Sequence, residues 1–134
     1  MTLPTVCFVE DSDLDFELGC VALLEVAPDA KVLRATSCRD GALAVLEHRP
    51  LLVFLDLNLP CCNGLEVIRE VMESTTADQG PLPVFVVFTT STNPVDRERA
   101  FAAGAADFLT KPTNPQRYLA SVESVARTWL PIAN

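Results

Sequence analysis

Residues 51–56, Leu-Leu-Val-Phe-Leu-Asp, form the stretch that decides the fold. Five consecutive apolar residues lead directly to a carboxylate, so the strand that they predict is apolar on both faces. Such a strand belongs inside a parallel sheet that helices cover on both sides. The stretch therefore predicts an α/β protein in which Asp56 stands at the carboxyl end of a central strand.

Short apolar runs alternate with longer amphipathic stretches in both directions from this strand. We expect strands at residues 6–9, 31–35, 51–55, 84–88 and 106–109. We expect helices at residues 13–26, 42–46, 64–74, 93–103 and 115–130. Ser12 or Asp13 can cap the first helix, and Gly104 is well placed to end the fourth. Five strand–helix units predict a doubly wound parallel sheet of five strands with five helices.

Length and composition fit one domain, which we expect to span residues 1–134. Hydrophobic residues make up 49% of the chain, and its formal net charge is −8. An acidic chain repels phosphate backbones, so we expect no nucleic-acid binding. No apolar run approaches the roughly 18 residues that a membrane span needs. Because residues 1–4 also lack the features of a signal peptide, we expect a cytoplasmic protein without membrane contact.

The five cysteines predict neither a disulfide framework nor a zinc site. Their count is odd, and no Cys-x-x-Cys pair occurs. We expect Cys7, Cys20 and Cys38 to pack as small apolar residues. Cys61 and Cys62 fall in a loop, where a reactive thiol is the alternative interpretation.

Polar residues follow four of the predicted strands, at the sheet edge where open α/β sheets bind ligands. Glu10 and Asp11 follow the first strand, Asp56 the third, Thr89 the fourth and Lys111 the fifth. Three carboxylates brought together repel one another unless a cation lies among them. Oxygen ligands of this kind suit Mg²⁺, which we expect as the cofactor.

The same residues fit the transfer of a phosphoryl group. Asp56 can attack a phosphoryl donor as a carboxylate nucleophile. Lys111 and the metal would neutralise charge on the transferred oxygens, and Thr89 could form a hydrogen bond with the phosphoryl group. Taken singly, each residue also has a purely structural explanation, as a helix cap, a turn residue or an ordinary surface residue. Only their combination at four strand ends favours the chemistry.

Several motifs together resemble the response-regulator receiver family over about residues 5–129. They are Val-Glu-Asp at 9–11, Leu-Asp-Leu-Asn-Leu-Pro at 55–60 with Gly64, Thr-Thr-Ser at 89–91, Ala-Gly-Ala at 103–105 and Lys-Pro at 111–112. The resemblance implies the flavodoxin-like strand order 2-1-3-4-5. It also implies a protein of two-component signalling that catalyses its own phosphoryl transfer and dephosphorylation without being an enzyme in the usual sense.

The resemblance assigns the acidic residues as follows. Asp56 would be the phosphoacceptor, and Asp11 would bind Mg²⁺ directly. Glu10 would act through a metal-bound water, and Asn58 would offer its backbone carbonyl to the metal. Glu10 is a departure, because the family more often has Asp at this position.

The remaining assignments concern the switch. Lys111 would contact a phosphoryl oxygen, and the Lys111–Pro112 bond is cis in many relatives. Thr89 would follow the phosphoryl group, and Phe108 would be the aromatic residue that moves with it. The surface that responds would consist of the fourth helix, the fifth strand and the fifth helix.

The resemblance implies a sensor histidine kinase as partner. The runs at 10–12 and 89–91 are similar to those of small regulators that partner bacterial phytochrome kinases, although regulators of other kinases share them. Only five residues follow Trp129, so we expect output through another protein or a role as a phosphate sink. The apolar residues at the end of the sequence have little core left to join; they are Trp129, Leu130, Pro131 and Ile132. Exposed apolar residues favour a protein contact, so we expect a homodimer.

Three alternatives remain. A small phosphatase with an Asp nucleophile would want a second Asp where this chain has Asn58. A flavodoxin-like FMN binder would need a phosphate-binding loop where residues 10–15 carry four carboxylates. A receiver-like interaction module without phosphorylation would not need the complete set of Asp11, Asp56, Thr89 and Lys111.

Overall fold

A computed structural model describes residues 3–60 and 62–131 of the chain. Its main sheet has five parallel strands in the order β2-β1-β3-β6-β7, which confirms the predicted order because β6 and β7 are the fourth and fifth strands of this sheet along the chain. The strands are β1 (Thr5–Val9), β2 (Lys31–Ala35), β3 (Leu52–Leu55), β6 (Val84–Thr89) and β7 (Asp107–Thr110).

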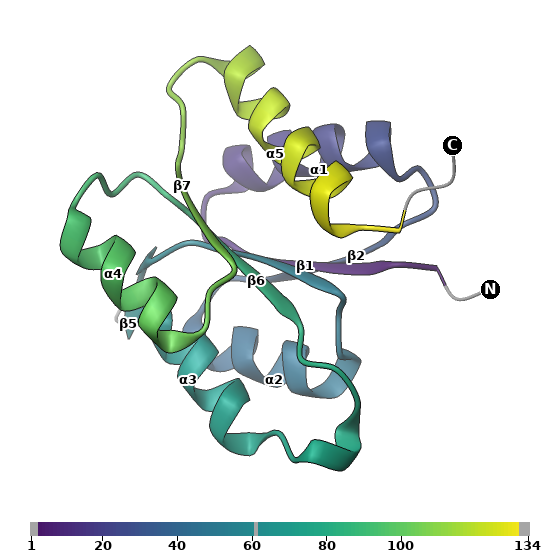
Figure 1. The fold of residues 1–134 in the computed structure, drawn as a ribbon. Helices are drawn as coiled ribbons and strands as arrows, with labels where there is room; N and C mark the ends of the chain where they lie inside the picture. Colours follow the sequence, from purple (N-terminus) through teal and green to yellow (C-terminus); the bar gives the residue numbers. More distant parts are fainter. Residues whose placement is uncertain (1–2, 61, 132–134) are drawn as a thin grey trace.

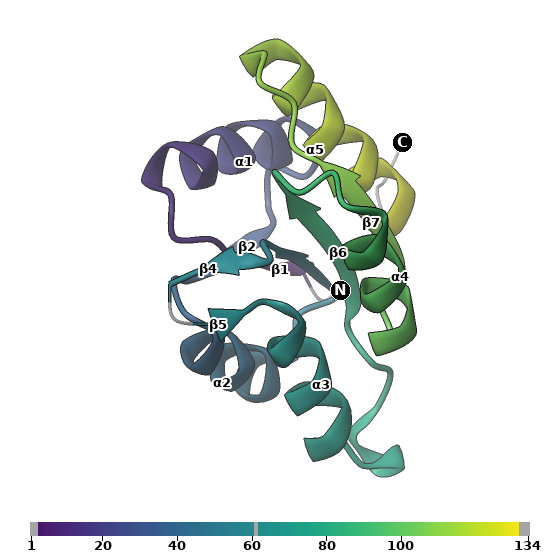
Figure 2. The same ribbon diagram turned by 90° about the vertical axis from the view of Figure 1, so that its left-hand side faces the viewer.

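Helices cover both faces of this sheet, as Figures 1 and 2 show. One layer contains α1 (Asp13–Val26) and α5 (Pro115–Trp129), which pack against each other. The other layer contains α2 (Cys38–His48), α3 (Leu65–Ser74) and α4 (Pro94–Ala103). Asn93, Asn114 and Ser12 cap α4, α5 and α1, and Gly104 ends α4 as predicted. No helix in the described ranges is both long and apolar enough to cross a membrane.

The core lies in two layers because side chains alternate along each central strand. In β3, Val53 and Leu55 pack with α2, α3 and α4, whereas Leu52 and Phe54 pack with α1 and α5. All four side chains are buried, as the unbroken apolar run predicted. Asp56 is therefore the first polar residue after this buried apolar strand.

Three local features differ from the prediction. A small antiparallel hairpin, β4 (Asn58–Leu59) and β5 (Cys62–Asn63), follows β3 where we expected a loop. The second helix begins at Cys38 rather than at residue 42, because Ser37 accepts a hydrogen bond from the Asp40 amide and so caps it. A 3₁₀ turn, η1 (Ala77–Gln79), interrupts the loop before β6.

The cysteine prediction is wrong at two positions. Cys38 and Cys62 form a disulfide between α2 and the hairpin, with their Cα atoms 6.4 Å apart. Cys7 is a free buried cysteine, as expected, and Cys20 is free and half-buried. Cys61 lies outside the described residues.

The end of the chain also differs from the prediction. We expected the apolar residues at 129–132 to find little core, but Leu130 is buried and packs with the α1–α5 layer. Trp129 is half-buried against the same layer, and Ile132 lies outside the described residues. The dimer prediction therefore loses the argument from an exposed tail.

Candidate functional site

The sheet brings the predicted residues together through its own backbone hydrogen bonds. The amide of Asp56 donates to the carbonyl of Val9 at 3.1 Å, so Asp56 continues the β1–β3 ladder beside Glu10. The amide of Lys111 donates to the carbonyl of Thr89 at 2.6 Å. Glu10, Asp56, Thr89 and Lys111 are the buried polar or charged residues of the described ranges. A buried polar group needs a hydrogen-bond partner, and these four residues lie together at the carboxyl end of the sheet.

The ammonium of Lys111 is the centre of the cluster. Its Nζ donates to Glu10 Oε1 at 2.5 Å, to Asp56 Oδ2 at 2.8 Å and to Asp15 Oδ2 at 2.8 Å. Three partners use all three donors of an ammonium group. Burial alone would lower the pKa of Lys111, but its hydrogen bonds to these carboxylates outweigh burial and raise the pKa well above its ordinary value. Lys111 is therefore a permanent cation at the carboxyl end of the sheet.

Glu10 has the opposite balance of effects. Burial raises the pKa of its carboxyl group, and the hydrogen bond and charge of Lys111 oppose that rise. Its second oxygen, Oε2, accepts the amide of Ser12 at 3.1 Å, which fixes the carboxylate at the entrance to α1. One carboxylate thus links the helix start to the lysine.

Packed aromatic side chains form an apolar layer beneath these charged groups. Phe8 and Phe54 stack with ring centroids 4.8 Å apart, and Phe88 lies 4.9 Å from Tyr118. The hydroxyl of Tyr118 donates to the carbonyl of Asp15, and burial raises the pKa of this phenol well above its ordinary value. Electrostatic interactions are stronger above such a low-dielectric floor than in water.

Asp15 is a member of the cluster that the sequence did not predict, because it is a partner of Lys111. The sequence shows it only as one of four carboxylates at residues 10–15. The available signal was its position, because Ser12 as N-cap makes Asp15 the third helical residue. Side chains there point back towards the helix N-terminus, and thus towards the strand ends.

Oxygen ligands for a hard cation lie beside the lysine. One carboxylate oxygen from each of Glu10, Asp11 and Asp56 lies within 4.8 Å of the others. Glu10 and Asp56 are buried whereas Asp11 is exposed, so an ion held here would keep solvent ligands as Mg²⁺ does. The donor set therefore fits Mg²⁺, and the structure brings all three predicted acidic residues together.

Asn58 joins Asp56 to the neighbouring strand end. Its amide donates to Asp56 Oδ1 at 3.0 Å, and its Nδ2 donates to the hydroxyls of Thr89 at 3.4 Å and Thr90 at 3.2 Å. Gly64 closes the hairpin directly against Asp56, since a Cβ at this position would lie 2.1 Å from the Asp56 carbonyl oxygen. Only glycine allows this close approach.

Thr89 and Phe108 lie on the same face of the sheet. Thr89 is opposite Thr110 and Val87 is opposite Phe108, so Phe108 stands two positions from the Thr89 pair. Both are buried, and Phe108 packs in the layer of α2, α3 and α4. The described residues contain no cis peptide bond, so Lys111–Pro112 is trans here, unlike in many members of the family it resembles.

Comparisons with known proteins show the family and the fold. The sequence pattern described as the response regulator receiver domain matches residues 6–123. The chain is 30% identical to protein PilH of Pseudomonas aeruginosa over 95 residues, covering 71% of this chain and 76% of PilH. It is 28% identical to the nitrate/nitrite response regulator NarL of Escherichia coli over 91% of this chain, but it spans only about half of NarL, 54%.

Two solved structures resemble the whole fold. The phosphorylated cyanobacterial phytochrome response regulator RcpA has a TM-score of 0.85 at 26% identity, covering 99% of this chain and 100% of RcpA. The Mn²⁺-bound form of response regulator Rcp1 has a TM-score of 0.82 at 28% identity, covering 98% and 97% of the two chains.

Proposed function

This chain belongs to the response regulator receiver family, and from that premise we propose that Asp56 accepts a phosphoryl group in a Mg²⁺-dependent reaction. One observation carries the proposal. A buried carboxylate at the end of the central strand shares a lysine ammonium with a second carboxylate and lies beside a third. That arrangement supplies a nucleophile, a fixed cation and oxygen ligands for a divalent ion at one place.

In the proposed reaction an Asp56 oxygen forms a bond to phosphorus while the bond from phosphorus to the donor nitrogen or oxygen breaks. The leaving group departs with the electron pair of that bond and takes up a proton from solvent. Asn58 holds Oδ1 and Lys111 holds Oδ2, so the carboxylate is oriented before the donor arrives. Lys111 then neutralises charge on the phosphoryl oxygens. The same residues would serve the return reaction with water, by which the protein dephosphorylates itself.

Glu10, Asp11, Asp56 and the backbone carbonyl of Asn58 would hold Mg²⁺. The ion, when bound, supplies positive charge to the transferred oxygens. The Mn²⁺-bound form of Rcp1 supports a divalent ion in a protein of this fold.

We further propose that Thr89 and Phe108 transmit the change. Among the described residues, the Thr89 hydroxyl accepts two long hydrogen bonds, 3.4 Å from Asn58 Nδ2 and 3.4 Å from the Ser91 amide. A phosphoryl group on Asp56 would offer it a stronger partner, and Phe108 on the same sheet face would follow into the space that it leaves. The α4–β7–α5 surface would then respond.

The partner that fits best is a sensor histidine kinase, and similarity to the phytochrome response regulator RcpA favours one of the phytochrome type. Output would pass to a downstream protein, or the chain would act as a phosphate sink. A homodimer through the α4–β7–α5 surface stays a prediction. Its support is the exposure of Val95 and Phe101 on α4, and a shallow depression lined by Leu109, Pro112, Arg117, Ala120, Ser121 and Ser124.

The alternatives fit less well. Asn58 donates to two threonine hydroxyls, and its carboxamide cannot act as a general acid or base, which counts against a phosphatase with a second acid at this position. Glu10, Asp11 and Asp15 around the strand end would repel the phosphate of FMN. A receiver-like module without phosphorylation would have no use for the buried lysine with its three carboxylates.

Incubation with acetyl phosphate and Mg²⁺ tests the proposal. We expect intact-mass analysis to show one added phosphoryl group on the wild type and on Asp29→Asn, an exposed control. Asp56→Asn should gain none. Equal labelling of Asp56→Asn and the wild type would contradict the assignment.

A further inference from the structure

Cys38 and Cys62 lie outside the proposed phosphorylation site, yet they join α2 to the hairpin that follows Asp56. Cys38 is the first residue of α2, and Cys62 lies on β5 of the hairpin that follows β3. The pair is separated by 24 positions in sequence. Asp56 lies between the two cysteines in the sequence, so the disulfide closes a covalent loop of the chain that contains the proposed phosphoacceptor.

The hairpin that the disulfide anchors carries the contact to Oδ1 of Asp56. Cys62 is paired with Leu59, and Asn63 is paired with Asn58. Asn58 in turn donates to Asp56 and to Thr89. The Leu59–Cys62 pair, which holds one end of the disulfide, is thus adjacent in the hairpin to Asn58, whose amide orients the Asp56 carboxylate.

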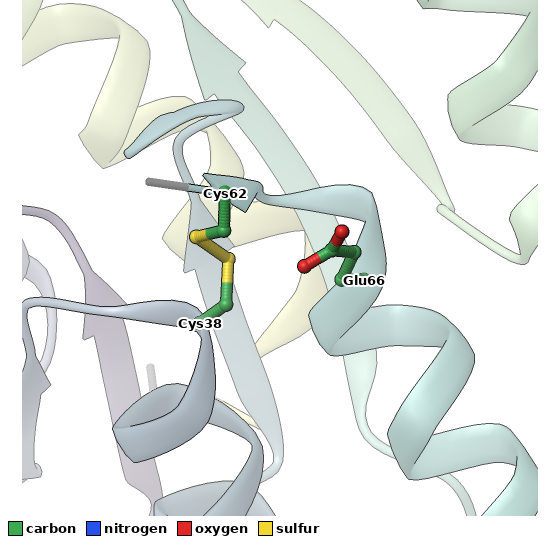
Figure 3. A group of neighbouring side chains, drawn as sticks. All are labelled: Cys38, Cys62 and Glu66. Carbon is green, nitrogen blue, oxygen red and sulfur yellow. A yellow bond between two sulfur atoms is a disulfide. The ribbon is translucent and has the colours of Figure 1, made fainter. Parts of the chain in front are cut away.

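The two cysteines differ in exposure to solvent, so an external thiol would reach the sulfur of Cys62 first. Cys38 is buried, whereas Cys62 is half-buried. The sulfur of Cys38 lies at the start of α2, where the helix dipole favours negative charge. Figure 3 shows Glu66 beside the pair, and its carboxylate lies within 4.8 Å of both sulfurs.

We propose that Cys38–Cys62 is a reversible dithiol–disulfide switch that sets the rate at which Asp56 is phosphorylated. The inference rests on the proposed function of Asp56. In the disulfide form the hairpin is held and the carboxylate is oriented. In the dithiol form the hairpin loses its covalent restraint, and phosphorylation is slower.

An external dithiol–disulfide couple supplies the electrons. A thiolate of the external dithiol attacks Cys62 Sγ, the S–S bond breaks, and Cys38 leaves as a thiolate and takes up a proton. The second external thiol attacks the mixed disulfide, releases Cys62 as a thiol and leaves the external molecule as a disulfide. Two electrons and two protons pass from the external dithiol to the two cysteines. Oxidation is the same exchange in reverse.

The test compares one protein in two redox states. Samples are treated with dithiothreitol or with oxidised glutathione, desalted, and labelled with acetyl phosphate and Mg²⁺. Peptide fragmentation identifies the linkage, and it must cut between residues 61 and 62 because Cys61 is adjacent to Cys62. We expect the reduced form to be phosphorylated at least about fivefold more slowly, the lower end of ordinary coupling between sites.

Variants separate the pair from other thiols. Cys38→Ser and Cys62→Ser should show the slow rate after either treatment, with circular dichroism confirming that they are folded. Cys20→Ser, which removes a half-buried free cysteine, should keep the dependence on redox state. Equal rates in both states of the wild type, or a linkage through other cysteines, would overturn the inference while leaving Asp56 as acceptor. Absence of phosphorylation in both states would overturn the proposed function and the inference with it.

Discussion

Lys111→Met offers the most direct examination of the charge cluster, because it removes the cation and keeps an apolar side chain of similar length. Three carboxylates would then lose their shared partner, and two of them, Glu10 and Asp56, are buried. Oxygens of these two groups lie within 4.8 Å of each other. At an effective dielectric constant of about 20, two unit charges at that distance repel by roughly 3.5 kcal/mol.

This figure agrees with the cost of about 3–5 kcal/mol that follows removal of one partner from a buried ion pair. We therefore expect Lys111→Met to lower the free energy of unfolding by about 3–5 kcal/mol at pH 7.5 without divalent ions. The loss should shrink at pH 5, because a proton on one carboxylate relieves the repulsion. Added Mg²⁺ should restore part of the stability and should bind the variant more tightly than the wild type.

Urea unfolding followed by circular dichroism measures the loss, in EDTA and again with Mg²⁺. The matched control is Lys31→Met, because Lys31 is the other lysine of the chain and is exposed. A loss for Lys111→Met no greater than that for Lys31→Met would refute the claim that the ammonium compensates buried carboxylates. Weaker Mg²⁺ binding by the variant would refute the claim that the two cations share the same oxygens.

Three further changes extend the examination. Burial raises the folded-state pKa of Glu10, so the folded protein binds more protons than the unfolded chain between pH 4.5 and that raised value. The wild type should therefore gain stability as pH falls from neutral towards 4.5, relative to Glu10→Gln; parallel urea profiles of the two proteins would contradict this. Asp15→Asn removes one half-buried partner of Lys111 and should cost about 1 kcal/mol in EDTA, and a loss as large as that of Lys111→Met would place Asp15 at the centre of the cluster instead. Gly64→Ala must move the hairpin away from Asp56, so we expect the free energy of unfolding in urea to fall by about 1–3 kcal/mol. Phosphorylation by acetyl phosphate should also be slower, and a normal rate would show that the close approach does not orient Asp56.

The sheet was predictable because its central strands are apolar on both faces. A strand such as β3 has one way to bury both sets of side chains, and its carboxyl end must then hold the first polar residue, Asp56. The same reasoning located Glu10, Thr89 and Lys111, since each follows a strand of the same parallel sheet. Helix boundaries were less secure, and α2 began earlier than expected because the cap at Ser37 carries no apolar periodicity.

Asp15 and the disulfide were harder to predict for different physical reasons. Asp15 acts through the direction of its side chain on α1, which periodicity does not report. Cys38 and Cys62 come together only because α2 starts beside the hairpin, a contact between segments that strand order alone does not specify. An odd number of cysteines argues against a disulfide framework, but it does not argue against one bridge whose two halves the fold places together. The predicted site and the disulfide that the sequence did not predict share the hairpin after β3. We therefore expect a change in the disulfide to alter the position of Asp56, and a change at Asp56 to alter the hairpin that holds the disulfide.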